Sequence, residues 1–373
     1  MKLILVSLFS ALFITNASAQ SYSIGRSSES VFDPSRNRAI PVEVYYPALS
    51  AGTNAEWATG TFPLIILGHG FAMTYSAYEN ISSFFVPKGY VFAMIDTENG
   101  LVGVSHGNFA ADYKYVKENL NLPGTLEQTT AYLGHSMGGG AAFLAASLGN
   151  QPDLLIGLAP AETNPSAISA SSLITIPTFV FSGEGDAVTP PSENHIPMYD
   201  DCASDCKGFI SILGGAHCYF AQSNFFCDFG ETTAGSDIQI NRAQQQDVLF
   251  DFLEPLFQTF LRDNNETFAQ FSDSLALSSR VSGTHTCDEN ALSFNASKSN
   301  LLTVYPSPAS HSINIKSFKN KLGHFEIRSS TGKLVSQGNC DTTSENINIS
   351  AWPAGIYHFK NADGQIRFKK LDL

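Results

Sequence analysis

One short segment combines a nucleophilic side chain with the small residues that a tight turn needs. Residues 134–138 read Gly-His-Ser-Met-Gly, the G-x-S-x-G spacing that places a serine between a strand and a helix. The strand-like run 129–133 precedes the motif and the alanine-rich run 141–148 follows it. The alternative is a glycine-rich turn with an idle serine. The context favours Ser136 as a nucleophile for covalent catalysis.

A serine hydroxyl needs a base to remove its proton and a third group to orient that base. Asp186 lies just past the strand-like run 177–181, and His217 lies just past the run 208–213. The carboxyl ends of parallel strands meet at one edge of a sheet, so both residues should face Ser136. We expect His217 to be the general base and Asp186 to orient it.

Four other histidines could compete with His217 for the role of base. His69 and His106 precede the serine, which reverses the usual order of serine, acid and histidine. His135 lies inside the turn, where it cannot reach round to its neighbour. His195 falls in an expected helix. The order and position therefore favour His217.

Glu184 is the nearest alternative to Asp186 as the acid. The stretch 186–190, Asp-Ala-Val-Thr-Pro, would carry Asp186 over the crevice at the edge of the sheet. We expect Glu184 to be a loop carboxylate that faces water.

A negatively charged tetrahedral intermediate needs two backbone N–H donors. Met137, directly after the serine, should supply one of them. The other should come from Phe71, because the run 64–67 leads into Gly-His-Gly-Phe and glycines let a backbone approach closely. The alternative for this loop is an ordinary strand-to-helix turn.

Strand-like and helix-like runs alternate over most of the chain, which predicts a doubly wound, mostly parallel α/β sheet. The expected strands are 40–46, 63–67, 90–95, 129–133, 154–158, 177–181 and 208–213. The expected helices are 75–85, 109–119, 138–148 and 193–199. A long closing helix should cover 238–262, with Pro255 kinking or splitting it.

The chain changes character after the closing helix. Residues 264–300 are polar and rich in Ser, Thr, Asn and Asp, which predicts a closing loop followed by a linker. Short alternating runs then predict a small antiparallel β unit. We therefore expect a catalytic domain over 20–290, a linker over 291–300 and a β domain over 301–373.

The first residues have the features of a signal peptide. Lys2 precedes an apolar run over 3–14, and Ala17-Ser18-Ala19 provides small residues for cleavage after Ala19. The alternative is a membrane anchor, but about 12 residues are too few to cross a bilayer of roughly 30 Å. We expect residues 1–19 to be removed and the protein to be exported and soluble.

Export makes disulfide bonds the first expectation for the cysteines. The chain has six of them. Cys202 and Cys206 could bridge a turn, and Cys218 and Cys227 could close a small loop, but the sequence does not determine the pairing. A zinc site is the alternative, although the spacing of known zinc motifs is absent. We expect no metal and no cofactor.

The charge of the chain narrows the range of partners. The net charge is −13, from 34 acidic and 21 basic residues, which argues against nucleic acid or an anionic membrane as the main partner. Residues 21–300 carry a net −18 and residues 301–373 a net +4. This asymmetry supports two units with different roles.

Residues 36–290 resemble the bacterial polyester-hydrolase and cutinase branch of the α/β-hydrolases, which is related to dienelactone-hydrolase-like lipases. The matching stretches are 44–47, 62–71, 89–97, 134–140, 158–160, 176–181, 185–190 and 214–217. The resemblance implies the same triad, the same two oxyanion donors and an open cleft lined by Phe71, Met137 and Val188. Ala161 departs from the family, which usually has a substrate-flanking Trp after 158–160.

Residues 301–373 resemble the C-terminal sorting domain of type IX secretion in Bacteroidetes. The matching stretches are 304–309, 332–335, 353–357 and 368–370, with Ser307 where the family usually has Asn. The alternative is a carbohydrate-binding β module. The resemblance implies a secreted or surface-attached protein that engages the type IX machinery.

These inferences combine into one expected function. We expect a secreted serine carboxylic-ester hydrolase that forms an acyl-enzyme on cutin-like or synthetic polyesters, with poly(ethylene terephthalate) among the candidates. The alternative is a lipase or small-ester carboxylesterase without polymer activity. A non-enzymatic binding protein on the same scaffold is the third hypothesis. We expect a monomer whose partners are the ester substrate and the secretion machinery.

Overall fold

The computed structural model describes residues 21–123, 126–288, 302–317, 320–329, 333–361 and 364–371. The expected signal peptide, 1–19, and the expected linker, 291–300, lie outside the described residues. Within the described ranges, no helix has the length and apolar character needed to cross a membrane.

A ten-stranded sheet forms the larger part of the molecule, in the order β10-β9-β8-β7-β6-β4-β5-β2-β1-β3. Strands β4 to β9 run parallel to one another, and β2 and β10 pair antiparallel with the two edges of this block. This confirms the mostly parallel sheet that the sequence predicts. The strands are β1 Ser23–Asp33, β2 Arg38–Ala48, β3 Gly52–Thr53, β4 Phe62–Gly68, β5 Val91–Ile95, β6 Leu126–His135, β7 Leu154–Leu158, β8 Thr178–Gly183, β9 Lys207–Ile212 and β10 Val281–His285.

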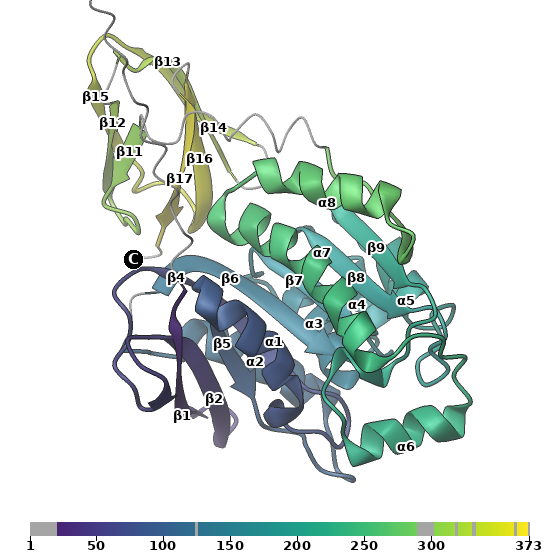
Figure 1. Ribbon diagram of the computed structural model, residues 1–373. Helices are drawn as coiled ribbons and strands as arrows, with labels where there is room; N and C mark the ends of the chain where they lie inside the picture. The colour runs from purple at the N-terminus through teal and green to yellow at the C-terminus, as the bar shows by residue number, and fades with distance from the viewer. Residues whose placement is uncertain are drawn as a thin grey trace, which may run out of the picture.

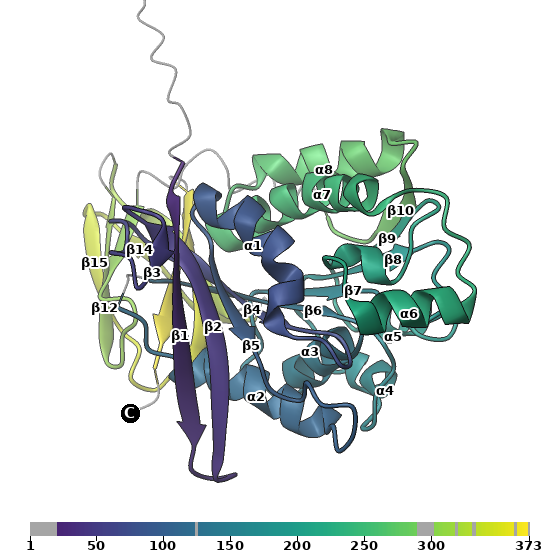
Figure 2. The same cartoon turned by 60° about the horizontal axis from the view of Figure 1, so that its bottom comes forward.

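Helices cover both faces of this sheet (Figure 2). On one face lie α1 (Glu79–Phe85), α7 (Arg242–Arg262) and α8 (Glu266–Leu277). On the other lie α2 (His106–Asn119), α3 (Met137–Ser147), α4 (Ala167–Ser171) and α5 (His195–Asp201). The three 3₁₀ turns are η1 Tyr75–Tyr78, η2 Val86–Lys88 and η3 Cys218–Phe220, and the remaining helix is α6 Phe225–Ala234.

Strand β4 shows why the sheet needs two layers of helices. Ile65 and Leu67 pack into the core on the α7 face, whereas Leu64 and Ile66 pack into the core on the α3 face. All four side chains are buried. Successive side chains of a strand point to opposite faces, so a continuous apolar run requires cover on both.

The polar stretch after the closing helix differs from the prediction. Residues 264–300 were expected to be a loop and a linker, but α8 and β10 lie within them. Phe268, Phe271 and Leu275 give α8 one apolar stripe. The average composition of residues 264–300 is polar, so it does not reveal this stripe. Strand β10 exposes most of its residues because it is an edge strand.

The closing helix also differs in detail from the prediction. Helix α7 begins at Arg242, where Asn241 caps it, and runs through Pro255 without splitting. Pro255 is itself buried, and buried apolar residues on both sides of it, from Val248 to Leu261, pack against the sheet. Packing of this face offsets the hydrogen bond that a proline removes.

The C-terminal residues form two small antiparallel sheets around their own apolar core, as the sequence predicts. Figure 1 shows them at the opposite end of the molecule from α6. Their strands are β11 Leu302–Tyr305, β12 Ser312–Ser317, β13 Gly323–Ser329, β14 Leu334–Cys340, β15 Ser344–Asn348, β16 Gly355–Asn361 and β17 Gly364–Lys370.

Candidate active site

Ser136 occupies a strained turn between β6 and α3. Its backbone has φ 54° and ψ −121°, outside the regions that an L-residue ordinarily adopts. Its N–H donates to the carbonyl of Leu158 over 2.9 Å, and its own carbonyl accepts from the amide of Gly140 over 3.0 Å. These bonds hold a conformation that costs of the order of 1–3 kcal/mol.

The two glycines of the motif make this turn possible. A Cβ on Gly134 would overlap the carbonyl of Gly138, and a Cβ on Gly138 would overlap the backbone of Gly68 and His69. Helix α3 therefore begins in direct contact with the loop that follows β4. Only glycine allows backbones to approach this closely.

The two expected oxyanion donors lie on the two sides of this contact. Met137 is the first residue of α3, where a backbone N–H has no acceptor within the helix. Phe71 follows Gly70, and a Cβ placed on Gly70 would lie 3.4 Å from the Cβ of Ser136. The loop that carries Phe71 is therefore adjacent to the serine.

The residues expected to line the cleft differ in exposure. The side chains of Phe71 and Val188 are exposed, whereas Met137 is buried. Ala161 is half-buried and its amide donates to the carbonyl of Ser136 over 2.9 Å. Phe71 and Val188 therefore present apolar side chains to solvent, and no large side chain stands at position 161.

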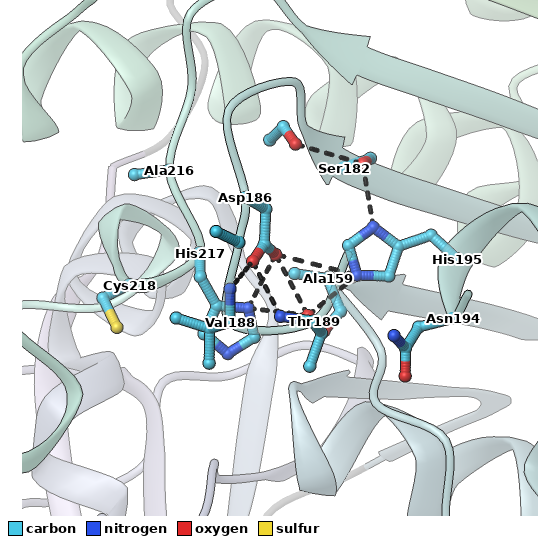
Figure 3. Close-up of polar contacts among 12 residues, drawn as sticks. Ala159, Ser182, Asp186, Val188, Thr189, Asn194, His195, Ala216, His217 and Cys218 are labelled. Carbon is cyan, nitrogen blue, oxygen red and sulfur yellow. Dashed lines mark hydrogen bonds and ion pairs between the residues drawn. The ribbon is translucent and has the colours of Figure 1, made fainter. Parts of the chain in front are cut away.

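Asp186 and His217 form a buried pair at the ends of β8 and β9 (Figure 3). Oδ2 of Asp186 lies 2.7 Å from Nδ1 of His217. Its Oδ1 accepts from the amides of Val188 and Thr189 over 2.8 and 2.9 Å. Burial alone would raise the pKa of Asp186, but the charge and hydrogen bond of His217 lower the pKa of this carboxyl below its usual range. The carboxylate is therefore ionised and aimed at His217.

The link between Ser136 and His217 is not closed by a hydrogen bond in the described residues. The connection runs instead through His135, whose Nε2 lies 3.0 Å from the carbonyl oxygen of His217. The two imidazole rings have centroids 4.8 Å apart. Serine and histidine therefore lie on adjoining segments, and Nε2 of His217 is the ring nitrogen that Asp186 leaves free.

The remaining candidates for acid and base have structural contacts of their own. His69 lies 2.8 Å from the carbonyl oxygens of both Gly70 and Thr97. His135 uses its other nitrogen to contact the Tyr78 hydroxyl over 2.7 Å. Glu184 is exposed and accepts from the amide of Gly214 over 2.9 Å.

A further buried histidine, His195, lies beside Asp186 and His217. Its position in an expected helix disfavours it as the base. Nε2 of His195 lies 3.0 Å from Thr189 Oγ1, and Nδ1 lies 2.8 Å from Ser182 Oγ. Thr189 Oγ1 also lies 3.0 Å from Asp186 Oδ2 and 2.9 Å from His217 Nδ1. Thr189 is thus the centre of a network (Figure 3), and its place in the Asp-Ala-Val-Thr-Pro stretch was the only signal for it.

The protons of this network can be assigned from charge. Burial lowers the pKa of His195 to about 3, despite the nearby carboxylate of Asp186, so the ring is neutral. The ionised carboxylate is the stronger acceptor for the Thr189 proton. Nε2–H of His195 then donates to Thr189, and Ser182 donates to Nδ1. Every member of the network is satisfied in this arrangement.

The loop that carries His217 is held from two directions. Glu231 on α6 is buried and accepts from the amides of His217 and Cys218 over 3.3 and 2.5 Å. Gln245 on α7 exchanges two hydrogen bonds of 2.8 Å with the backbone of Ala216. These contacts fix the backbone on either side of the imidazole.

Two disulfide bonds are present. Cys218 pairs with Cys227, one of the pairings that the spacing allowed. This bond ties the His217 loop to α6. Cys206 pairs with Cys287 rather than with Cys202, so the Cys202–Cys206 bridge that the spacing would allow does not form. Cys202 is a buried free thiol whose sulfur lies 3.7 Å from the carbonyl oxygen of Ile174.

Two family models match the chain. A model described as PET hydrolase-like matches residues 41–233. A model described as a secretion system C-terminal sorting domain matches residues 303–371. The two matches fall on the large sheet unit and on the C-terminal sheets, and the sorting domain supports secretion or attachment to the cell surface.

Curated relatives are similar over part of their length. Cutinase est1 of Thermobifida alba is 26% identical over 182 residues, which cover 47% of this chain and 56% of the relative. A bis(hydroxyethyl) terephthalate hydrolase of Streptomyces coelicolor is 25% identical over 178 residues, with 47% and 54% covered. A cutinase of Thermobifida fusca is 24% identical over 182 residues, with 47% and 56% covered. The chain spans about half the length of these relatives.

Proposed function

The chain belongs to the PET hydrolase-like family, and from this premise we propose that it is a secreted serine carboxylic-ester hydrolase. The observation that carries the proposal is the conjunction of a serine on a strained strand-to-helix turn with a buried Asp186–His217 pair at the same edge of the sheet. The order Ser136, Asp186, His217 along the chain is the order typical of α/β-hydrolases.

In the proposed acylation step, the hydroxyl oxygen of Ser136 attacks the ester carbonyl carbon. Nε2 of His217 takes the serine proton, and the ionised Asp186 stabilises the imidazolium through Nδ1–H. The amides of Met137 and Phe71 donate to the oxyanion. The intermediate then collapses: the bond to the leaving alcohol breaks, His217 protonates that alcohol, and the acyl group stays on Ser136.

Deacylation repeats the same proton transfers with water. His217 takes a proton from water while the water oxygen attacks the acyl carbon. The second intermediate releases the carboxylic acid, and the proton returns from His217 to Ser136. The cycle needs no redox partner, because water supplies both the hydroxyl and the proton of the products.

Polyesters are the substrate class that we propose first. Phe71 and Val188 expose apolar side chains to solvent, and exposed apolar side chains suit a chain segment of a large insoluble substrate better than an enclosed pocket would. Two of the relatives are named as cutinases and one as a bis(hydroxyethyl) terephthalate hydrolase.

Ala161 favours a second candidate, a small-ester carboxylesterase or lipase without polymer activity. A methyl group at this position offers little surface on which an aromatic polyester ring could stack. The two candidates share the catalytic residues and differ only in the acyl group that the cleft accepts.

A substrate panel tests the proposal and separates the two candidates. The purified protein is assayed on p-nitrophenyl esters of increasing acyl length, on cutin and on amorphous polyester film, with Ser136→Ala as the control. We expect hydrolysis of the soluble esters and release of acids from at least one polymer. Activity on soluble esters alone would favour the small-ester candidate, and no ester hydrolysis at all would refute both.

A further inference from the structure

Helix α6 presents an aromatic face to solvent. Phe225, Phe226 and Phe229 are 77%, 48% and 61% exposed. The rings of Phe225 and Phe229 are stacked with centroids 6.3 Å apart, and Phe226 meets Phe225 edge-on at 5.5 Å. Contiguous exposed apolar groups of this kind mark interaction surfaces, and nothing in the proposed catalytic cycle uses them.

The opposite face of α6 is fastened to the loop that carries His217. Cys227 is bonded to Cys218, and Glu231 is buried against the amides of His217 and Cys218. Residues 227 and 231 are one helical turn apart, so one side of α6 serves as the attachment. The aromatic rings stand on the other side.

The end of α6 is fastened to the loop that carries Asp186. Ser236 Oγ accepts from the amide of Ala187 over 3.1 Å, and the amide of Asp237 donates to the carbonyl of Gly185 over 3.1 Å. Helix α6 is therefore bracketed by the segments of both His217 and Asp186. Whatever the aromatic face contacts is brought to the mouth of the proposed active site.

We propose that the aromatic face of α6 (Phe225, Phe226 and Phe229) is the adsorption site for the uncharged surface of a water-insoluble ester, such as a solid polyester. This inference rests on the proposed function and adds to it the element that holds the enzyme on its substrate. An extended surface needs no pocket, so three rings on one convex helix can rest on it together.

The area of the face argues against a second protein as the occupant. Three phenylalanine side chains at these exposures offer roughly 400 Å². A stable protein interface needs about 800 Å² from each partner. A second copy of this chain would therefore find too little surface on α6.

Charge argues against an anionic membrane. The aromatic face carries no charged side chain, since Thr232 and Thr233 complete it. Asp228, at its border, is paired with Arg242, and the whole chain is at −13. Adsorption to anionic lipids depends on clusters of basic residues, which α6 does not have. A neutral ester surface fits this chemistry.

The test compares two triple variants that each remove three exposed apolar side chains. One is Phe225→Ser, Phe226→Ser and Phe229→Ser on α6. The matched control is Phe32→Ser, Leu173→Ser and Leu277→Ser, on other elements and similarly exposed. Adsorption to amorphous polyester film is measured by quartz crystal microbalance in a Ser136→Ala background, so that catalysis does not erode the film. Hydrolysis of a soluble p-nitrophenyl ester is measured in the native-serine background.

We expect the α6 variant to need at least about tenfold more protein for half-saturation of the film, because apolar area drives adsorption. Its kcat/KM on the soluble ester should stay within about twofold of the parent, since the rings do not touch the reacting atoms. The control variant should match the parent in both measurements.

Equal adsorption of the α6 variant and its parent would overturn the inference. The inference would also be overturned if the α6 variant kept its film adsorption but lost a dimer seen for the parent in light scattering. The same holds if it kept its film adsorption but lost binding to phosphatidylglycerol vesicles. Failure of the proposed function looks different: the wild-type chain would not hydrolyse the soluble ester, while the adsorption comparison would remain readable.

Discussion

The hydroxyl of Thr189 lies 2.9 Å from Nδ1 of His217, the same ring nitrogen that lies 2.7 Å from Asp186. Asp186 and the Thr189 hydroxyl therefore both contact Nδ1 of His217. The same hydroxyl also contacts a second histidine, His195. A hydrogen bond donated by the Thr189 hydroxyl to the carboxylate withdraws part of the negative charge that Asp186 presents to His217. We therefore expect the network to moderate the proposed acid–base pair as well as to support it.

Thr189→Val removes this hydroxyl while keeping the shape of the side chain. The carboxylate of Asp186 then attracts the protonated imidazole more strongly, so the acid limb of the pH profile of kcat/KM should move to higher pH, by up to about one unit. The variant should also be less stable by about 1–3 kcal/mol, because Nε2–H of His195 loses its acceptor. Thr189→Ser keeps the hydroxyl and should behave as the parent. An unchanged profile in Thr189→Val would remove Thr189 from this positioning role.

Buried neutral histidines should make the protein sensitive to mild acid. Burial lowers the pKa of His69, His135 and His195, in the last case to about 3. In the unfolded chain a histidine has a pKa of about 6.5. Below that pH the unfolded state binds more protons than the folded state, so the free energy of unfolding falls as the pH drops from about 7 to 5.

His195→Gln tests this sensitivity at one position. The glutamine cannot take up a proton, so the slope of unfolding free energy against pH should become shallower, by up to about 1.4 kcal/mol per pH unit near pH 5. Urea denaturation at pH 5, 6 and 7 measures the slope. The same slope in the variant and the parent would show that His195 is not kept neutral by burial.

The sequence predicts those elements whose local order of apolar, polar and glycine residues matches their burial and contacts in the folded protein. Several of the parallel strands are continuous apolar runs, and the G-x-S-x-G turn brings its own glycines, so both are visible without coordinates. The network of Ser182, Thr189 and His195 is not, because its contacts join separate loops. The Cys206–Cys287 pairing is likewise a long-range contact across β9 and β10.

The missed elements have a different explanation. Helix α8 alternates apolar with polar residues and strand β10 is short and mostly polar, and both fold because they pack on an existing sheet. Helix α6 buries only Glu231 in its whole length. Its apolar residues point outward, which is the reverse of the pattern that predicts a surface helix.

The disulfide bonds predict a defined thiol count and two different losses of stability. The described residues contain two free cysteines, Cys202 and Cys340, so denatured, unreduced protein should react at two thiols. In the chain-entropy model, opening the 81-residue loop of Cys206–Cys287 costs about 4.5 kcal/mol and opening the nine-residue loop of Cys218–Cys227 about 2.6 kcal/mol.

Serine substitutions separate the roles of the two bridges. Cys206→Ser with Cys287→Ser should lower the midpoint of thermal unfolding more than Cys218→Ser with Cys227→Ser. The second pair should have the larger effect on kcat/KM, because it releases the loop that carries His217. A thiol count of six in the parent would contradict the account.

The C-terminal sheets should be dispensable for hydrolysis. Figure 1 shows them far from α6 and the loops that flank it, and every proposed catalytic residue precedes residue 218. Ending the chain near Asn300 should therefore leave kcat/KM on a soluble ester within about twofold, since few buried contacts would be lost. Export in the native host should fail. A large drop in kcat/KM in a truncated protein that is still folded would assign the C-terminal unit a role in catalysis.

The central claim is that Ser136 carries the acyl group. Mass spectrometry of the protein quenched shortly after mixing with a p-nitrophenyl ester tests it most directly, with Ser136→Ala as the control. The account predicts one acyl group on the peptide that contains Ser136, no acyl group on the variant, and a turnover by the folded variant that is lower by roughly four or more orders of magnitude. An acyl group on another residue, or hydrolysis by Ser136→Ala within tenfold of the parent, would contradict it.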